Sequence, residues 1–265
     1  MKNAVTITLA SGAVGLAALF LGYHAGTARA PQEAAAPAAM ASAAPDRSAI
    51  EAIVKDYLIN NPEIMLDVQN ALETKQAAAA KAGQSEAIAA NSDKLFHSPN
   101  DAVFGNPNGD VTVVEFFDYN CGYCKHALPD MNALLKSDPN IRFVMKEFPI
   151  LGPDSVRAHV VARAFKSLMP EKYLEFHRAL LGQQGRATEQ AAIDVAVKLG
   201  ADETQLREKM KAPDIATAFQ DNYQIANSLN ITGTPSYVIG NEVVPGAIGL
   251  DGLAQKIADQ RDANG

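Results

Sequence analysis

Residues 111–128 read VTVVEFFDYNCGYCKHAL and contain both cysteines of this 265-residue chain, Cys121 and Cys124. The first seven residues are rich in β-branched and aromatic side chains, which is typical of a short buried strand. Lys125 to Lys136 then carries apolar residues at helical spacing, and Ile141 to Phe148 (IRFVMKEF) resembles a second strand. The stretch therefore predicts a strand, a C-x-x-C motif, a helix and a strand, in that order.

Three uses of the two thiols can be compared. A structural zinc site needs four ligands, but the chain has one cysteine pair, and its histidines show no ligand spacing with that pair. A structural disulfide is disfavoured because stabilisation grows with loop length, and this loop holds only Gly122 and Tyr123. A two-residue loop favours reversible exchange, since the second thiol can resolve a mixed disulfide formed at the first. We therefore interpret Cys121 and Cys124 as a redox centre and expect no metal and no other cofactor.

The two cysteines are expected to differ in reactivity. Cys121 falls where the strand ends and the helix starts, so unpaired N–H groups and the helix dipole stabilise its thiolate and lower its pKa. Cys124 lies one turn further and is more shielded. This asymmetry predicts an outer sulfur that attacks or is attacked and an inner sulfur that resolves.

Composition limits the class of partner. The formal net charge is −7 and no dense run of Lys or Arg occurs, which argues against nucleic acid. With 48% hydrophobic residues the chain is long enough to bury a core.

Residues 1–30 are typical of an export segment, with one Lys at the start, a long uncharged run and Ala28-Arg29-Ala30 at the end. Two alternatives stay open, namely a cleaved signal peptide or an uncleaved membrane anchor. Pro31 would follow the cut and disfavours cleavage, whereas the apolar run is long enough to span a bilayer. Either alternative places the remaining chain outside the cytoplasm, where thiols can be held oxidised.

Residues 31–45 are rich in Ala and Pro and predict a linker. Residues 46–98 predict a helical stalk of two helices, separated at Asn61-Pro62, with apolar side chains at i, i+3, i+4 and i+7. Within it, Glu73–Ala90 favours helix but offers no large side chain for packing. The apolar stripes either dock on the main domain or join chains into a homo-oligomer through residues 46–75.

Residues 99–265 are expected to form one α/β domain. A helical insertion is predicted at about 153–230, where Asp202 and Gln205 resemble a capping box and Gly200 suits a helix end. A hairpin with a Gly240-Asn241 turn and a last helix at about 250–258 follow.

Two motifs together resemble a known family. VVEFFDYNCGYC, the late TGTPSYVIG (residues 232–240) and the helical insertion between them are similar to the DsbA-like thiol-disulfide oxidoreductases of the thioredoxin superfamily, over roughly residues 106–258. The resemblance implies a thioredoxin fold with an inserted helical subdomain, here preceded by the stalk. It also implies that Thr234-Pro235 carries the cis-proline that packs against the cysteines in that family.

Glu115 lies six residues before Cys121, where the family carries a buried acid. The resemblance implies that Glu115 relays a proton to or from Cys124, with a pKa raised by burial. The alternative is that strand alternation turns Glu115 towards solvent. Asp118, Lys125 and His126 are interpreted as solvated residues.

Departures from the family pattern bear on the direction of the reaction. Strongly oxidising relatives carry Pro-His between the cysteines and Val before the cis-proline, whereas this chain has Gly122-Tyr123 and Thr234. These residues resemble the ScsC-like and isomerase branches. IEAIVKDYLINNPEIM, residues 50–65, is also similar to the oligomerisation segment of ScsC-like proteins.

The sequence therefore predicts an envelope thiol-disulfide oxidoreductase or disulfide isomerase. Its expected partners are exported client proteins with thiols or disulfides and a membrane redox partner. Oxidation, reduction and isomerisation all stay open. The competing hypothesis is a non-catalytic envelope protein, for binding or assembly, that retains the fold.

Overall fold

The computed structural model describes residues 46–264. The predicted export segment (1–30) and linker (31–45) lie outside the described residues. Helix α1 (Arg47–Asn60) belongs to one compact unit, and the second unit begins at Asn61. Within residues 46–264, none of the helices has the length and apolar character needed to span a lipid bilayer.

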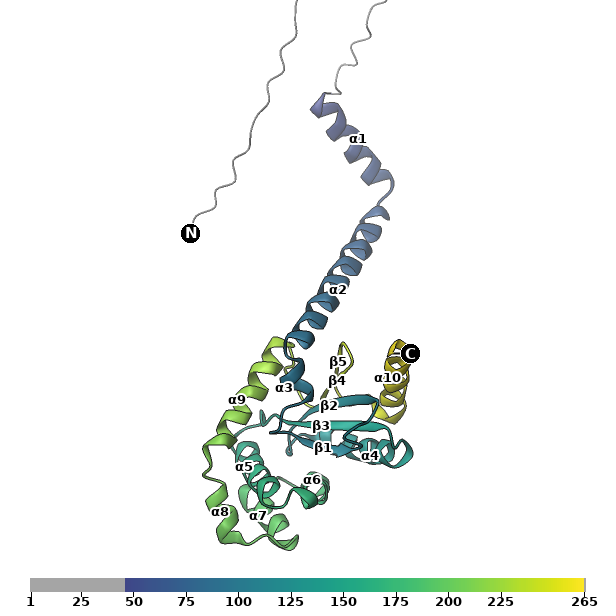
Figure 1. The fold of residues 1–265 in the computed structure, drawn as a ribbon. Coiled ribbons are helices and arrows are strands. Elements are labelled where there is room, and N and C mark those ends of the chain that lie inside the picture. Colours follow the sequence, from purple (N-terminus) through teal and green to yellow (C-terminus); the bar gives the residue numbers. More distant parts are fainter. Residues whose placement is uncertain (1–45, 265) are drawn as a thin grey trace, which may run out of the picture. The chain divides into compact units, whose positions relative to one another are not determined.

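A mixed sheet forms the centre of the second unit (Figure 1). Its strand order is β1-β3-β2-β4-β5, with β2 and β3 parallel and all other neighbours antiparallel. The strands are β1 (Ala102–Gly105), β2 (Val111–Phe117), β3 (Ile141–Glu147), β4 (Ser236–Ile239) and β5 (Glu242–Pro245). Because parallel neighbours need a crossover, helix α4 (Gly122–Ser137) joins β2 to β3. The predicted strand, C-x-x-C, helix and strand are confirmed, and so is the α/β thioredoxin fold class.

Helices cover both faces of the sheet, and alternation along β2 assigns its side chains to one face or the other. Val113 and Phe117 share a core with α4 and with α10 (Gly249–Asn264). Val114 and Phe116 belong to the opposite core, together with α9 (Pro213–Ser228). Both faces of β2 are therefore dry, so a charged side chain on either face is costly unless it is compensated.

The insertion between β3 and β4 is helical, as predicted. It comprises α5 (Pro153–Leu168), a 3-10 turn (Pro170–Lys172), α6 (Tyr173–Gly182), α7 (Glu189–Lys198), α8 (Glu203–Lys209) and α9. The capping prediction is confirmed, since the Asp202 side chain accepts a hydrogen bond of 2.8 Å from the N–H of Gln205. Gly200 has φ of +99°, the left-handed conformation expected at a helix end.

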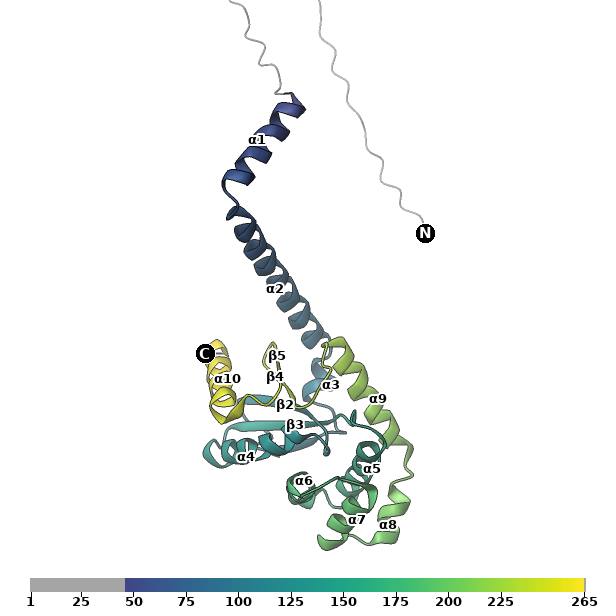
Figure 2. The ribbon, with the colours of Figure 1, turned by 180° about the vertical axis from the view of Figure 1, so that it is seen from behind.

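Two short elements were not predicted, β1 and α3 (Ser92–Phe96). The expectation that Glu73–Ala90 offers nothing for packing was wrong at its end. Ile88 of α2 (Ile64–Ala90) and Leu95 of α3 are 2% and 0% exposed, in the same core as α9. Figures 1 and 2 show α3 beside α9 from opposite sides, and Lys94 forms an ion pair of 2.7 Å with Asp221. The end of α2 is thus part of the folded domain.

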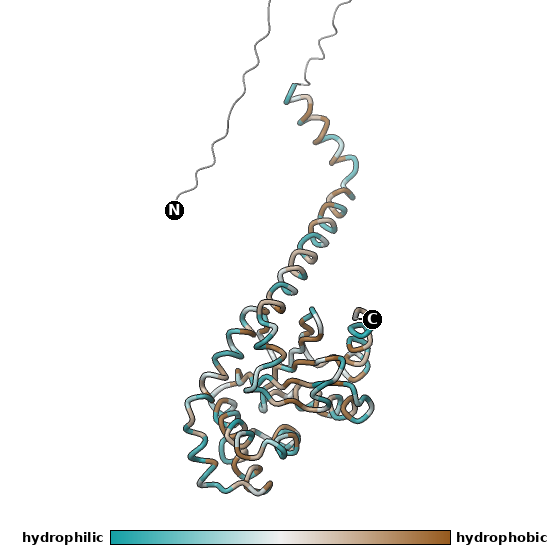
Figure 3. The backbone as a smooth tube through the Cα atoms, viewed as in Figure 1, coloured by the Kyte–Doolittle hydropathy of each residue, from teal (hydrophilic) through white to brown (hydrophobic). Residues whose placement is uncertain are grey.

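The apolar stripes of the predicted stalk are real features of its helices. In α1, Ile53 and Tyr57 are 68% and 58% exposed. In the first half of α2, Met65 and Leu72 are 59% and 52% exposed. Figure 3 shows hydrophobic residues recurring along each of these helices.

Candidate active site

Cys121 is the N-cap of α4. The helix begins at Gly122, three residues earlier than predicted, because Cys121 ends the β2 loop in an extended conformation (φ −77°, ψ 118°) and its side chain caps the first turn. The N–H of Cys124 points at Sγ of Cys121 over 3.4 Å. Placement at the start of the helix, expected from the sequence, is confirmed.

The two thiols have opposite electrostatics. Hydrogen bonding from the Cys124 thiol, from Thr234 and from the N–H groups of Cys124 and Tyr123 lowers the pKa of Cys121 to about 6, although burial opposes this. Burial, above all, raises the pKa of Cys124 far above its usual range, and the charge of Glu115 adds to this effect. At neutral pH, Cys121 is therefore a thiolate in the reduced protein and Cys124 is a thiol.

The Thr234-Pro235 segment lies next to Sγ of Cys121. The Thr234-Pro235 peptide bond is cis, as the resemblance implied. In the thiol form, Sγ of Cys121 donates a hydrogen bond of 3.0 Å to the carbonyl oxygen of Thr234. The structure thus brings the C-x-x-C motif and the late T-P motif, 113 residues apart, into direct contact.

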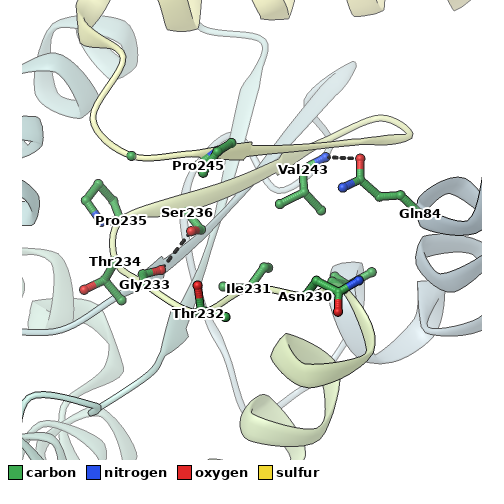
Figure 4. Close-up of a pocket in the computed structure, with 12 residues that line it drawn as sticks. Gln84, Asn230, Ile231, Thr232, Gly233, Thr234, Pro235, Ser236, Val243 and Pro245 are labelled. Carbon is green, nitrogen blue, oxygen red and sulfur yellow. Dashed lines mark hydrogen bonds between the residues drawn. The ribbon is translucent and has the colours of Figure 1, made fainter. Parts of the chain in front are cut away.

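A pocket of about 340 Å³ adjoins the cis-proline loop (Figure 4). Its wall combines the loop 229–236, the end of β5 and one residue of the stalk helix, Gln84 of α2. Oε1 of Gln84 accepts a hydrogen bond of 3.0 Å from the N–H of Val243, which is drawn in Figure 4. Thr234 belongs both to this wall and to the Cys121 contact, so the pocket lies next to the residue that meets the C-x-x-C motif.

Glu115 is buried beneath the motif, and the alternative of a solvent-facing side chain was wrong. The residue is 3% exposed, lies on the same face of β2 as Val113 and Phe117, and is paired across the sheet with Tyr237 of β4. Burial, with a smaller contribution from the charge of Cys121, raises its pKa to about 8. No hydrogen bond from the described chain lowers the pKa of this carboxyl, so nothing offsets the effect of burial.

Gly122 and Tyr123 form the outer side of the motif. Tyr123 is 70% exposed, and a Cβ placed on Gly122 would meet no atom within 4 Å. The dipeptide therefore borders solvent.

Sequence reasoning missed the role of the residues just before Cys121. Asp118, interpreted as solvated, is fully buried, and its carboxylate accepts hydrogen bonds from the N–H groups of Asn120 (2.8 Å) and Leu151 (3.0 Å). Asp and Asn favour turns that are closed by their own side chains, so the D-x-N motif of residues 118–120 could have predicted this turn. Lys125 is half-buried and donates hydrogen bonds to carbonyl oxygens of the loop between α6 and α7, whereas His126 is exposed, as expected.

A second buried acid, Glu147, lies at the end of β3. Burial opposes its ionisation, but the charge of Arg163 and hydrogen bonds from His159 and Tyr173 outweigh burial and lower its pKa. Tyr173 donates a hydrogen bond of 2.5 Å to Oε1, and Arg163 lies 3.7 Å from Oε2. The sequence signal was an adjacent charged pair, Lys146-Glu147, at the end of a strand in which Arg142 is the one other charged residue.

Metal ligands are not gathered near the cysteines. Across the part of the chain that the structure describes, no three His, Cys, Asp or Glu side chains are grouped to hold an ion.

Residues 112–258 match the DSBA-like thioredoxin domain family. The chain belongs to this DSBA-like family. Residues 46–79 match a second family, described as the copper resistance protein ScsC N-terminal domain.

Solved structures extend the likeness. A thioredoxin-like oxidoreductase from Silicibacter pomeroyi is 41% identical, with 64% of this chain and 97% of that chain covered and a TM-score of 0.61. Proteus mirabilis ScsC in a transitional conformation is 27% identical, with 80% of this chain and 94% of that chain covered and a TM-score of 0.61. The second alignment reaches beyond the DSBA-like region.

Curated relatives are covered less completely. The Na(+)/H(+) antiporter NhaA 1 of Salinispora arenicola is 27% identical over 158 residues, which are 59% of this chain and 24% of the antiporter. Others, named putative protein-disulfide oxidoreductases, have 59% to 61% of their length covered. The DSBA-like chain thus spans about a quarter of the first relative and less than two thirds of these others.

Proposed function

We propose that this DSBA-like protein is a thiol-disulfide oxidoreductase that oxidises, reduces or isomerises disulfides in exported proteins. The observation that carries the proposal is the asymmetry of the two thiols. Cys121, with a pKa of about 6, meets the cis-proline loop, and Cys124 lies buried behind it with a raised pKa. A stable thiolate outside and a protonated thiol inside are what a reversible exchange centre needs.

In the oxidising direction, a client thiolate attacks Sγ of Cys121 in the Cys121–Cys124 disulfide. The bond between the two protein sulfurs breaks, its electron pair goes to Cys124, and a mixed disulfide joins the client to Cys121. Cys124 needs a proton because its pKa is raised, and protonated Glu115, with a pKa of about 8, supplies it.

The second half of the reaction releases the client. Another client thiolate attacks the client sulfur of the mixed disulfide, and Cys121 departs as a thiolate. The client gains a disulfide, and the protein is left with two thiols. The same steps in reverse reduce a client, and a mixed disulfide resolved by a different client thiol isomerises it.

The client segment is placed along Thr234 and into the adjoining pocket. Thr234 meets the reacting sulfur and also lines the pocket, so a client cysteine at Cys121 brings its flanking residues there. Tyr123, 70% exposed, supplies an aromatic contact at the mouth of the site.

The protein works in the periplasm or cell envelope. A membrane redox partner returns the two cysteines to their starting oxidation state.

The protein assembles as a homo-oligomer through residues 46–75. Similarity of residues 46–79 to the ScsC N-terminal domain supports the assembly, as do the exposed apolar residues of α1 and early α2. Ile53→Lys should therefore lower the mass in light scattering, whereas Lys55→Gln should leave it unchanged. Equal masses would contradict assembly through α1.

Cysteine variants test the activity. Cys121→Ser should abolish insulin reduction and the refolding of a scrambled client, while Cys124→Ala should accumulate a mixed disulfide at Cys121. Activity retained by Cys121→Ser would overturn the proposal. No trapped client, together with a Cys121 pKa near the ordinary ~8.5, would favour the non-catalytic binding protein instead.

A further inference from the structure

Asn120, directly before Cys121, makes a two-point contact with a backbone segment of the insertion. Its Nδ2 donates a hydrogen bond of 2.9 Å to the carbonyl oxygen of Ala187, and the N–H of Ala187 donates one of 2.8 Å to its Oδ1. Nδ2 also donates a hydrogen bond of 3.1 Å to Oγ of Ser155. Both polar atoms of the amide are therefore engaged in hydrogen bonds.

The partners of Asn120 come from two separate elements of the insertion. Ser155 lies in the first turn of α5 and is fully buried, and Ala187, also fully buried, lies between α6 and α7. The same α6–α7 loop is held from the other side of the motif, because Nζ of Lys125 donates hydrogen bonds to the carbonyl oxygens of Gln183 (3.1 Å) and Gly185 (2.7 Å). The loop is thus tied to residues on either side of C-x-x-C.

The hydrogen bonds of Asn120 fix the backbone next to Cys121. The N–H of Cys121 donates a hydrogen bond of 2.9 Å to the carbonyl oxygen of Asp118, and the N–H of Asn120 donates to the Asp118 carboxylate over 2.8 Å. The turn from Asp118 to Cys121 is consequently closed on itself and attached to the insertion at Asn120. From this position Sγ of Cys121 reaches the N–H of Cys124 and the carbonyl oxygen of Thr234.

We propose that Asn120 is a positioning residue, which links the helical insertion to the redox motif and holds Cys121 in the cap geometry that its exchange reaction uses. The inference rests on the thiol-disulfide exchange proposed above. The helical insertion then helps to set the reactivity of Cys121, in addition to covering the sheet.

The competing explanation is that the hydrogen bonds of Asn120 only stabilise the fold. The chain offers a matched control for this explanation. Asn106 bridges two loops at the other end of β2, since Nδ2 donates to the carbonyl oxygen of Pro139 (3.1 Å) and Oδ1 accepts from the N–H of Asn108 (2.9 Å). Asn106→Ala removes a similar amide bridge and leaves the surroundings of Cys121 intact.

The test compares Asn120→Ala with Asn106→Ala in the full chain. Thiolate absorbance and the rate of iodoacetamide alkylation are followed against pH, and the exchange equilibrium with glutathione is measured at pH 7. Partial loss of hydrogen bonds to a charged sulfur should raise the pKa of Cys121 in Asn120→Ala by about one unit. Because the thiolate of the reduced form is then less stable, the equilibrium moves about fivefold towards the disulfide, or about 20 mV to more negative potential.

Asn106→Ala should leave both the pKa and the equilibrium unchanged while lowering the melting temperature. Ser155→Ala removes one of the three hydrogen bonds, is mild enough to fold, and should raise the pKa by an intermediate amount. An unchanged Cys121 pKa in Asn120→Ala, or in Ser155→Ala if the first variant does not fold, would overturn the positioning role. Alkylation does not require client exchange, so a wild-type protein with a low pKa but no exchange with glutathione would contradict the proposed function alone.

Discussion

Glu115 and Glu147 lie on neighbouring parallel strands, two register positions apart, and are 3% and 2% exposed. Their surroundings are opposite. Glu147 meets Arg163, His159 and Tyr173, and its pKa is lowered. Glu115 receives no hydrogen bond from the described chain, and its pKa is raised to about 8. Equal burial on the same face of one sheet thus produces one ionised and one protonated carboxyl at neutral pH.

The two acids are equally buried, so the difference in their pKa values comes from their ion-pair and hydrogen-bond partners. A buried carboxyl with such partners is a structural acid, whereas one without them can transfer protons. An ionised Glu147, with Tyr173 hydrogen-bonded to Oε1 and with His159 and Arg163 3.5 and 3.7 Å from Oε2, connects the insertion helices α5 and α6 to the end of β3. Glu115 carries a proton beneath Cys124 with no partner to retain it, and its pKa of about 8 suits the proton transfer proposed above.

Removing the counter-charge of Glu147 should give the largest effect on stability. Arg163→Met leaves a buried carboxylate without its cation, which typically costs about 3–5 kcal/mol. Urea unfolding at pH 7 measures the loss, and Arg178→Met, at an exposed arginine that bonds to Asn132, should stay within about 0.5 kcal/mol. A loss below about 1 kcal/mol for Arg163→Met would mean that Glu147 is not compensated by this ion pair.

Exchange kinetics should separate the two acids. Glu115→Gln removes the proton donor for Cys124 and should slow mixed-disulfide formation about a hundredfold at pH 7. Glu147→Gln keeps the motif intact and should change this rate by less than about threefold. Stopped-flow mixing of the oxidised protein with a thiol peptide gives both rates. Equal rates for the two variants would contradict the claim that Glu115, and not Glu147, is the proton donor.

The pH dependence of stability should also have opposite signs. The folded-state pKa of Glu115 is raised from 4.5 to about 8, so its ionisation destabilises the fold progressively as pH rises through that window. Glu115→Gln should therefore gain about 4 kcal/mol relative to wild type between pH 4 and pH 8. With an unpaired amide that costs about 2 kcal/mol at either pH, the variant should be about 2 kcal/mol less stable than wild type at pH 4 and about 2 kcal/mol more stable at pH 8. Glu147 has a lowered pKa, so its contribution is present above about pH 4.5 and is lost on acidification. Denaturation of the reduced variants at both pH values checks these signs, and a loss for Glu115→Gln at pH 8 would contradict them.

Sequence alone located the redox motif, the two long strands and the insertion, because runs such as VTVVEFF and the helical spacings are local signals. It could not find β1, which has four residues, or the burial of Asp118, whose partner Leu151 lies 33 residues away in the chain. The cis-proline came from family resemblance, and no local pattern placed it on Cys121. Ile88 was missed because an alanine-rich helix does not show which end meets a core. Catalytic roles for Glu115, Thr234 and Pro235 stay predictions until variants are measured.

The most direct test of the central claim is a pH titration of Cys121 in the reduced protein, read from thiolate absorbance and confirmed by alkylation. Cys124→Ala removes the second sulfur and serves to assign the signal. The midpoint should lie near 6 in wild type and should be higher in Cys124→Ala, because the Cys124 thiol is the first cause of the lowered pKa. A wild-type midpoint near the ordinary ~8.5 would contradict this prediction.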